Sequence, residues 1–221
     1  MRKEENGMKI KISIICLLVG ALFLCTVVPA HALQFGFYNI SGNSAVDAAI
    51  GEAQLYVEVT DPEGDQALFT FGNTGLEDCS ITDVYFADGS LLGIASIDDS
   101  DGIVSFSQNA TPGNLPSGKD ITPAFETTAG FSADSDPPTQ PMGVNPGESL
   151  GVIFTLQNGL GYTDTIGALR DGTLRIGIHV QGFESGGSES FVNNVPDASI
   201  MFLLGPSLFA LALFSRKKSR K

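Results

Sequence analysis

Two short acidic clusters hold the residues best suited to binding a metal ion. Each places three carboxylates within five residues or fewer, next to a glycine that allows a tight turn. The first consists of Asp61, Glu63 and Asp65, and the second of Asp98, Asp99 and Asp101. Carboxylate oxygens are the hard ligands that Ca²⁺ prefers, but neither cluster has the spacing of an EF-hand loop. The sequence leaves two interpretations open: a calcium site at one of these turns, or solvated acidic turns. We expect no other cofactor.

Catalytic chemistry has less support in the sequence. Beyond the N-terminal segment the chain has one histidine, His179, and no triad motif surrounds it. Paired carboxylates can hydrolyse glycosides, yet no acidic pair stands apart from the turn-like clusters. We expect no catalytic activity, and a secreted glycan hydrolase is the weakest of the alternatives.

The elements that position these residues are predicted to be strands. In residues 54–60, Leu55, Val57 and Val59 share one face and the residues between them share the other. This alternation is typical of half-buried antiparallel strands. The candidate strands are residues 54–60, 67–71, 81–86, 91–97, 103–107, 151–157 and 173–183. With Gly-, Pro- and Asp-rich turns between them, they predict an all-β fold, an antiparallel β-sandwich or jelly roll.

Other local patterns are fewer. Residues 164–172 form the one helix candidate, about two turns long. Residues 130–147 contain four prolines and predict a long surface loop. No internal repeat is present, so residues 33–193 are expected to form one domain.

The N-terminal 32 residues have the composition of a secretory signal peptide. Four basic residues precede an apolar stretch from Ile12 to Val28, and the small residues Ala30 and Ala32 follow it. This order predicts cleavage between Ala32 and Leu33. An uncleaved N-terminal membrane helix is the alternative. Cleavage would leave Cys79 as the only cysteine, either as a buried small hydrophobic residue or as a partner in an intermolecular disulfide.

The region between the two ends is strongly acidic. Residues 33–215 contain 23 acidic and three basic residues, a net charge of −20. Such a chain repels nucleic acid and anionic membrane surfaces, so a nucleic-acid partner is excluded.

Carbohydrate binding usually uses exposed aromatic rings. The chain has no tryptophan, and its candidates for stacking on a sugar are Tyr38, Tyr56, Tyr85 and Tyr162.

The C-terminal segment, residues 194–221, has three parts. Val195, Pro196, Asp197 and Ala198 begin it, residues 198–214 carry no charge, and residues 216–221 are almost all basic. As a helix, the 17 uncharged residues would span about 25 Å, slightly less than a hydrocarbon core of about 30 Å. The basic end predicts a single membrane helix with its C-terminus inside the cell. A buried C-terminal helix is the alternative, and it would need a polar face that this run lacks.

This arrangement resembles the PEP-CTERM sorting signal. Asp197 stands where that motif usually has glutamate and Ala198 where it has a second proline, which is closer to the Val-Pro-Asp variants. The resemblance implies processing near residues 195–198 by an exosortase, a membrane protease of Gram-negative bacteria that make exopolysaccharide. It also implies transient anchoring in the inner membrane and delivery to the cell surface or biofilm matrix.

Two functions for residues 33–193 therefore come first. One is a non-enzymatic surface or matrix protein associated with exopolysaccharide, and the other is a polysaccharide-binding adhesin module. The resemblance covers the C-terminal segment only, so it does not distinguish between them.

Overall fold

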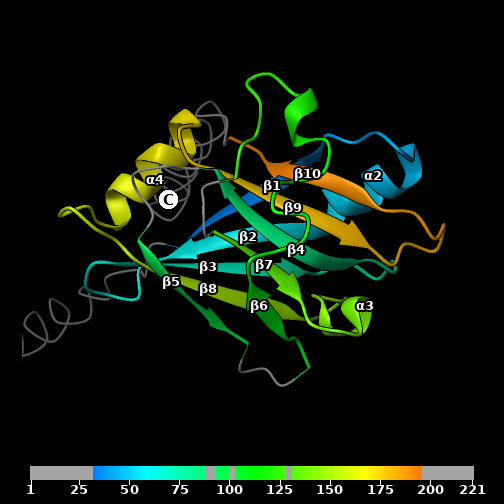
Figure 1. The fold of residues 1–221 in the computed structure, drawn as a ribbon, viewed down its shortest axis with the longest axis horizontal. Helices are drawn as coiled ribbons and strands as arrows, with labels where there is room; N and C mark the ends of the chain where they lie inside the picture. The colour runs from blue at the N-terminus through cyan, green and yellow to red at the C-terminus, as the bar shows by residue number, and fades with distance from the viewer. Residues whose placement is uncertain (1–31, 88–92, 100–102, 128–130, 196–221) are drawn as a thin grey trace, which may run out of the picture. The chain divides into compact units, whose positions relative to one another are not determined.

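The computed structural model describes residues 32–87, 93–99, 103–127 and 131–195 (Figure 1). The predicted signal peptide up to His31, the C-terminal segment from Pro196 onward, and Asp101 lie outside the described residues. Ala30, Pro196, Asp197 and Ala198 are therefore not described, whereas Ala32, Leu33 and Val195 are. Within the described ranges, no helix is both long and apolar enough to span a membrane.

Ten antiparallel strands form one continuous sheet in the order β5-β8-β3-β2-β1-β10-β9-β4-β7-β6. The strands are β1 Leu33–Asn39, β2 Leu55–Thr60, β3 Gln66–Asn73, β4 Ser80–Ala87, β5 Ile94–Asp98, β6 Phe106–Gln108, β7 Ser132–Ser135, β8 Ser149–Thr155, β9 Arg175–Gln181 and β10 Glu189–Asn193. The helices are α2 Ala45–Gln54, the 3₁₀ turn η1 Gly118–Asp120, α3 Thr139–Met142 and α4 Tyr162–Asp171. The predicted antiparallel all-β architecture is confirmed.

Strand β1 joins the two halves of the sheet. Its residues Leu33–Gly36 pair with β2, whereas Phe37–Asn39 pair with β10 on the opposite edge. Because one strand belongs to both halves, the expected pair of separate sheets is replaced by a single sheet that folds over on itself.

Phenylalanine rings fill the space between the two halves. Phe69 on β3 and Phe86 on β4 are five strands apart in the sheet order, yet their ring centroids are 5.2 Å apart in an edge-to-face contact. Phe86 also contacts Phe154 on β8, with centroids 4.9 Å apart. All three side chains are fully buried. The main core therefore lies inside the folded sheet.

The helices follow from local signals. The helix expected at residues 164–172 is confirmed as α4, where the amide of Gly161 donates to Asp164 Oδ2 and Gly172 ends the helix with a positive φ of 76°. The sequence did not predict α2. Ser44 caps it by accepting from the amide of Asp47, and Gly51 packs directly on the Phe191 ring.

The predicted loop at residues 130–147 is wrong in part. Strand β7 and the one-turn helix α3 lie within it. Pro137 and Pro138 lie between these two short elements, and Pro141 lies within the single turn of α3.

Replacing Phe86 with alanine tests the core. Removing this fully buried ring leaves a cavity between the two halves, so we expect the free energy of unfolding to fall by about 3–5 kcal/mol. Denaturant unfolding of the variant and the parent gives the difference. Leu76→Ala is the matched control, because Leu76 is 96% exposed and its loss should change stability by less than about 0.5 kcal/mol. Equal effects of the two changes would contradict the described core.

Candidate functional site

The chain enters and leaves the sheet close together. Strand β1 begins at Leu33, the residue after the predicted cleavage site. At the other end, the amide of Asn194 donates to the carbonyl of Gly36 over 2.8 Å, and Val195 follows with its side chain 52% exposed. Helix α2 and the turns beside it lie at the opposite end of the sheet, on the right of Figure 1 with α4 on the left.

The two acidic clusters predicted for calcium do not come together. Strands β3 and β5 both pair with β8, so β8 can be used to compare the positions of the two clusters. Asp65 lies next to Gln66, which pairs with Thr155 of β8, whereas Asp98 pairs with Gly151, four residues earlier on β8. Four residues along a strand span roughly 13 Å. No group of three or more His, Cys, Asp or Glu side chains among the described residues is arranged to hold a metal ion.

The first cluster has a structural use. Asp61 Oδ1 accepts a hydrogen bond from the amide of Glu63 over 3.0 Å, which stabilises the turn between β2 and β3. Asp98 ends β5, Asp99 follows it, and Asp101 is outside the described residues. Calcium binding stays a prediction.

A row of polar residues crosses four neighbouring strands on the face away from the main core. The register pairs Ser190 with His179, His179 with Asp83, and Asp83 with Asp134. Residues directly opposite in antiparallel strands have Cβ atoms about 5 Å apart, so each member lies beside the next. His179 Nδ1 lies 3.2 Å from Ser190 Oγ.

The carboxyl of Asp83 is the most perturbed member of this row. Burial raises its pKa to about 6, the hydrogen bond from Thr82 opposes the rise, and the charge of Asp134 adds to it. The Thr82 hydroxyl donates to Asp83 Oδ2 over 2.8 Å. The Tyr85 hydroxyl lies 3.2 Å from Asp83 Oδ1 and 3.1 Å from the carbonyl of Pro112, to which it can donate.

The row combines a serine, a histidine and an aspartate, but a substrate has poor access to it. Ser190 is 1% exposed and Asp83 3% exposed. Burial lowers the pKa of His179, against the opposing influence of Glu189, which favours the neutral ring. A buried hydroxyl cannot meet an external carbonyl, so this geometry does not favour nucleophilic hydrolysis.

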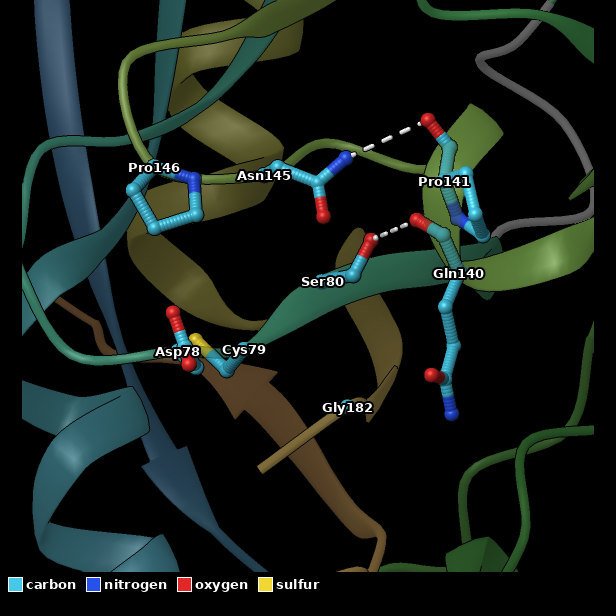
Figure 2. Close-up of a pocket in the computed structure, with 8 residues that line it drawn as sticks. All are labelled: Asp78, Cys79, Ser80, Gln140, Pro141, Asn145, Pro146 and Gly182. Atoms are coloured by element: carbon cyan, nitrogen blue, oxygen red, sulfur yellow. Dashed lines mark hydrogen bonds between the residues drawn. The ribbon is translucent and has the colours of Figure 1, made fainter. Parts of the chain in front are cut away.

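A cleft of about 260 Å³ lies beside Cys79 (Figure 2). Its polar groups bind one another: the Ser80 hydroxyl donates to the carbonyl of Gln140 over 3.0 Å, and the Asn145 amide donates to the carbonyl of Pro141 over 3.4 Å. Figure 2 shows both side chains turned toward these carbonyls. The Ser80 and Asn145 side chains are therefore engaged by the protein itself, while the Asp78 carboxylate and the Gln140 side chain also line the cleft.

The thiol of Cys79 beside this cleft is buried, which agrees with the interpretation of Cys79 as a buried small hydrophobic residue. Its side chain is 2% exposed, and the Gln54 amide donates to Sγ over 2.9 Å. Burial raises the pKa of Cys79, although hydrogen bonds from Gln54 and Asn73 oppose the rise. The residues that line the cleft include no histidine to act as a base. This environment favours the neutral thiol, which is a weak nucleophile.

Glu189 is a buried carboxylate that the sequence did not single out. Its side chain accepts from the Ser41 hydroxyl, from Asn39 Nδ2 over 2.9 Å and from the amide of Asn43 over 3.2 Å. Burial alone would raise the pKa of Glu189, but these bonds and the amide of Ser44 together lower it. Glu189 therefore fastens the turn between β1 and α2 to the start of β10.

Two of the four tyrosines proposed for carbohydrate stacking have structural roles. Tyr85 is fully buried under the segment that contains Leu115 and Phe125, so its predicted surface role is wrong. The Tyr162 hydroxyl donates to the carbonyl of Val59 over 3.1 Å and holds α4 on β2. Tyr56 is half-buried, and Tyr38 is 40% exposed.

Comparisons with known proteins find no match to a family model, a curated protein or a solved structure.

Burial of Cys79 predicts slow reaction with thiol reagents. We expect a Cys16→Ser, Cys25→Ser variant, in which Cys79 is the only cysteine, to react at least about tenfold more slowly with an aromatic disulfide reagent when native than in denaturant, because burial disfavours the thiolate and blocks access. Release of the coloured thiol measures both rates. An equally fast reaction of native protein, or a disulfide-linked dimer on a non-reducing gel, would contradict this burial.

Asp83 predicts a specific dependence of stability on pH. The folded pKa of about 6 exceeds the ordinary value of 3.8, so the folded state keeps a proton that the unfolded state has released between about pH 4 and pH 6. Stability from this group is complete below about pH 4 and is lost as the pH rises through 6. The difference corresponds to ~3 kcal/mol.

Asp83→Asn tests this dependence, because asparagine has the same shape and no charge. We expect the variant to be more stable than the parent at pH 8, and this advantage to shrink at pH 4. Denaturant titrations at both pH values measure it. Asp120→Asn removes an exposed carboxyl and should not change the pH dependence. A pH dependence that is unaltered in Asp83→Asn would refute the role of Asp83.

Proposed function

We propose that the chain is exported and that residues 33–193 are a body displayed at the cell surface or in the biofilm matrix. An exosortase-type membrane protease processes it at residues 195–198. One observation carries the proposal: strand β10 ends at Asn193, just before the sorting motif begins at Val195. Among the described residues, Asn194 makes the last backbone hydrogen bond, to Gly36, and the exposed Val195 follows it.

This boundary suits proteolytic processing. A protease binds its substrate as an extended segment outside a folded core. Two residues separate the end of β10 from Pro196, so the motif begins close to the end of the last described strand. The start of β1 at Leu33 supports removal of the signal peptide in the same way, since cleavage after Ala32 would leave the whole strand intact.

The remaining parts of the C-terminal segment complete the route. Residues 198–214 are the proposed transient anchor in the inner membrane, and residues 216–221 the basic stop on its cytoplasmic side. Association with exopolysaccharide belongs to the proposal through the resemblance of this segment. On the body, Tyr38 is the most exposed tyrosine and the best placed to stack on a sugar ring.

Paired substitutions in a Gram-negative host that contains an exosortase test the sorting step. We expect Pro196→Ala with Asp197→Ala to leave the protein unprocessed in the membrane fraction, and deletion of residues 195–221 to release or misroute the body. The matched control is Pro62→Ala with Glu63→Ala, an exposed proline–acid pair within the body. Fractionation and intact mass measure the outcome.

The sorting proposal would be ruled out if the parent and the motif variant had the same location and the same C-terminus by intact mass, or if the deletion left the location unchanged. Unchanged processing in a host that lacks the exosortase would also rule it out.

A further inference from the structure

A groove of about 490 Å³ lies at the end of the sheet opposite to the point where the chain leaves it. Three separate segments form it: the first turns of α2, the turn between β3 and β4, and the turn between β9 and β10. We call it the distal groove and define it by Val46, Asp47, Ile50, Glu77, Asp78 and Glu184. Its volume is within the range of pockets that bind several side chains or a small ligand.

The walls of the distal groove are fixed to one another. The Ser185 hydroxyl donates to Asp47 Oδ2 over 2.6 Å, which joins the β9–β10 turn to α2. The Gln54 amide donates to the carbonyl of Glu77 over 2.8 Å, which joins the β3–β4 turn to the other end of the same helix. The groove is thus present before any partner binds, so binding requires little ordering of the protein.

The floor of the distal groove is aliphatic and partly open to solvent. Val46 is 69% exposed, and Ile50 beside it is half-buried. Leu76, next to Glu77 in the β3–β4 turn, is 96% exposed but does not line the groove. Exposed aliphatic side chains gathered at one place commonly mark a contact surface. Aliphatic groups suit the side chains of a polypeptide, whereas sugar rings prefer aromatic platforms.

The rim of the distal groove is acidic and has no basic residue of its own. Four carboxylates line it, and no lysine, arginine or histidine does. Among the four, Asp47 is the buried one, with only 3% of its surface exposed. A carboxylate can accept about four hydrogen bonds, and the Ser185 hydroxyl supplies one. A buried carboxylate is stabilised by a cationic partner, and its neighbours along the groove are all neutral or acidic.

We propose that the distal groove binds a basic, amphipathic polypeptide segment, with aliphatic side chains on Val46 and Ile50 and ammonium or guanidinium groups against the four carboxylates. A second copy of the body is a poor occupant. Its residues 33–193 contain three basic side chains, Lys119, Arg170 and Arg175, among many acidic ones. The inference does not depend on the sorting proposal, and its failure would leave that proposal unchanged.

Binding of labelled peptides to the full-length protein in neutral detergent micelles tests the proposal. A fluorescent peptide of alternating lysine and leucine is the probe, and protein-free micelles are the blank. Peptides of alternating glutamate and leucine, and of alternating lysine and serine, separate the charge requirement from the aliphatic one. We expect anisotropy to rise only with the lysine–leucine peptide, and higher salt to weaken its binding.

Two variants locate the binding site. Glu77→Gln, Asp78→Asn and Glu184→Gln together remove three exposed charges from the rim, and Val46→Ser removes part of the floor. Each should weaken binding about tenfold or more with an unchanged melting temperature. The control combines Glu63→Gln, Asp120→Asn and Glu126→Gln, which remove the same charge from exposed positions elsewhere.

Full affinity in this control supports the distal groove. An equal loss of affinity in the control would show that the peptide is attracted by the overall charge and not by the groove. Equal binding of the lysine–serine peptide would show that the aliphatic floor does not contribute to binding. Either result would overturn the proposal. So would no binding of the lysine–leucine peptide, or tighter binding of a glucosamine oligomer at the same groove.

Discussion

The change of pairing partner within β1 is the constraint on which the rest of the structure depends. Its first four residues extend the half of the sheet that contains β2, and its last three extend the half that contains β10. This shared strand makes one sheet of the two halves and encloses the phenylalanine core. It also brings Leu33 and Asn194 to one region, and the opposite end of the sheet carries α2 and its neighbouring turns.

Carboxylates serve three different purposes in this acidic body, and their hydrogen-bond donors decide which. Glu189 is buried among hydroxyl, amide and backbone donors, and these lower its pKa despite burial. Asp83 has fewer donors and an acidic neighbour, so its pKa is raised. Asp47 has a single hydroxyl donor at the edge of an open groove. The carboxylate of Glu189 thus stabilises a turn, that of Asp83 lowers the stability of the fold at high pH, and that of Asp47 faces the distal groove.

Local periodicity predicts much of the sheet, and long-range contacts explain what it misses. Strands β2, β3, β4, β5, β8 and β9 and helix α4 follow from patterns within a few residues, and the strand predicted at residues 103–107 overlaps the start of β6. Strand β10 starts with Glu189, a residue type that is more typical of turns. Its burial depends on hydrogen-bond donors from residues 39–44, which only the pairing of β1 with β10 brings close to it. The alternating pattern of β4 places Tyr85 on the face away from the main core, where the sequence predicts exposure. A segment that starts more than twenty residues later in the chain covers this face and buries the ring. The distal groove joins three turns that no local pattern relates.

The central claim is that a folded body, bounded by β1 and β10, is trimmed at both ends on its way out of the cell. Mass spectrometry of the protein recovered from the cell surface or matrix of an exosortase-containing host tests this most directly. The account predicts a mature N-terminus at Leu33 and a C-terminus between residues 195 and 198. A recovered protein that still ends at Lys221, or that starts at Met1, would contradict it.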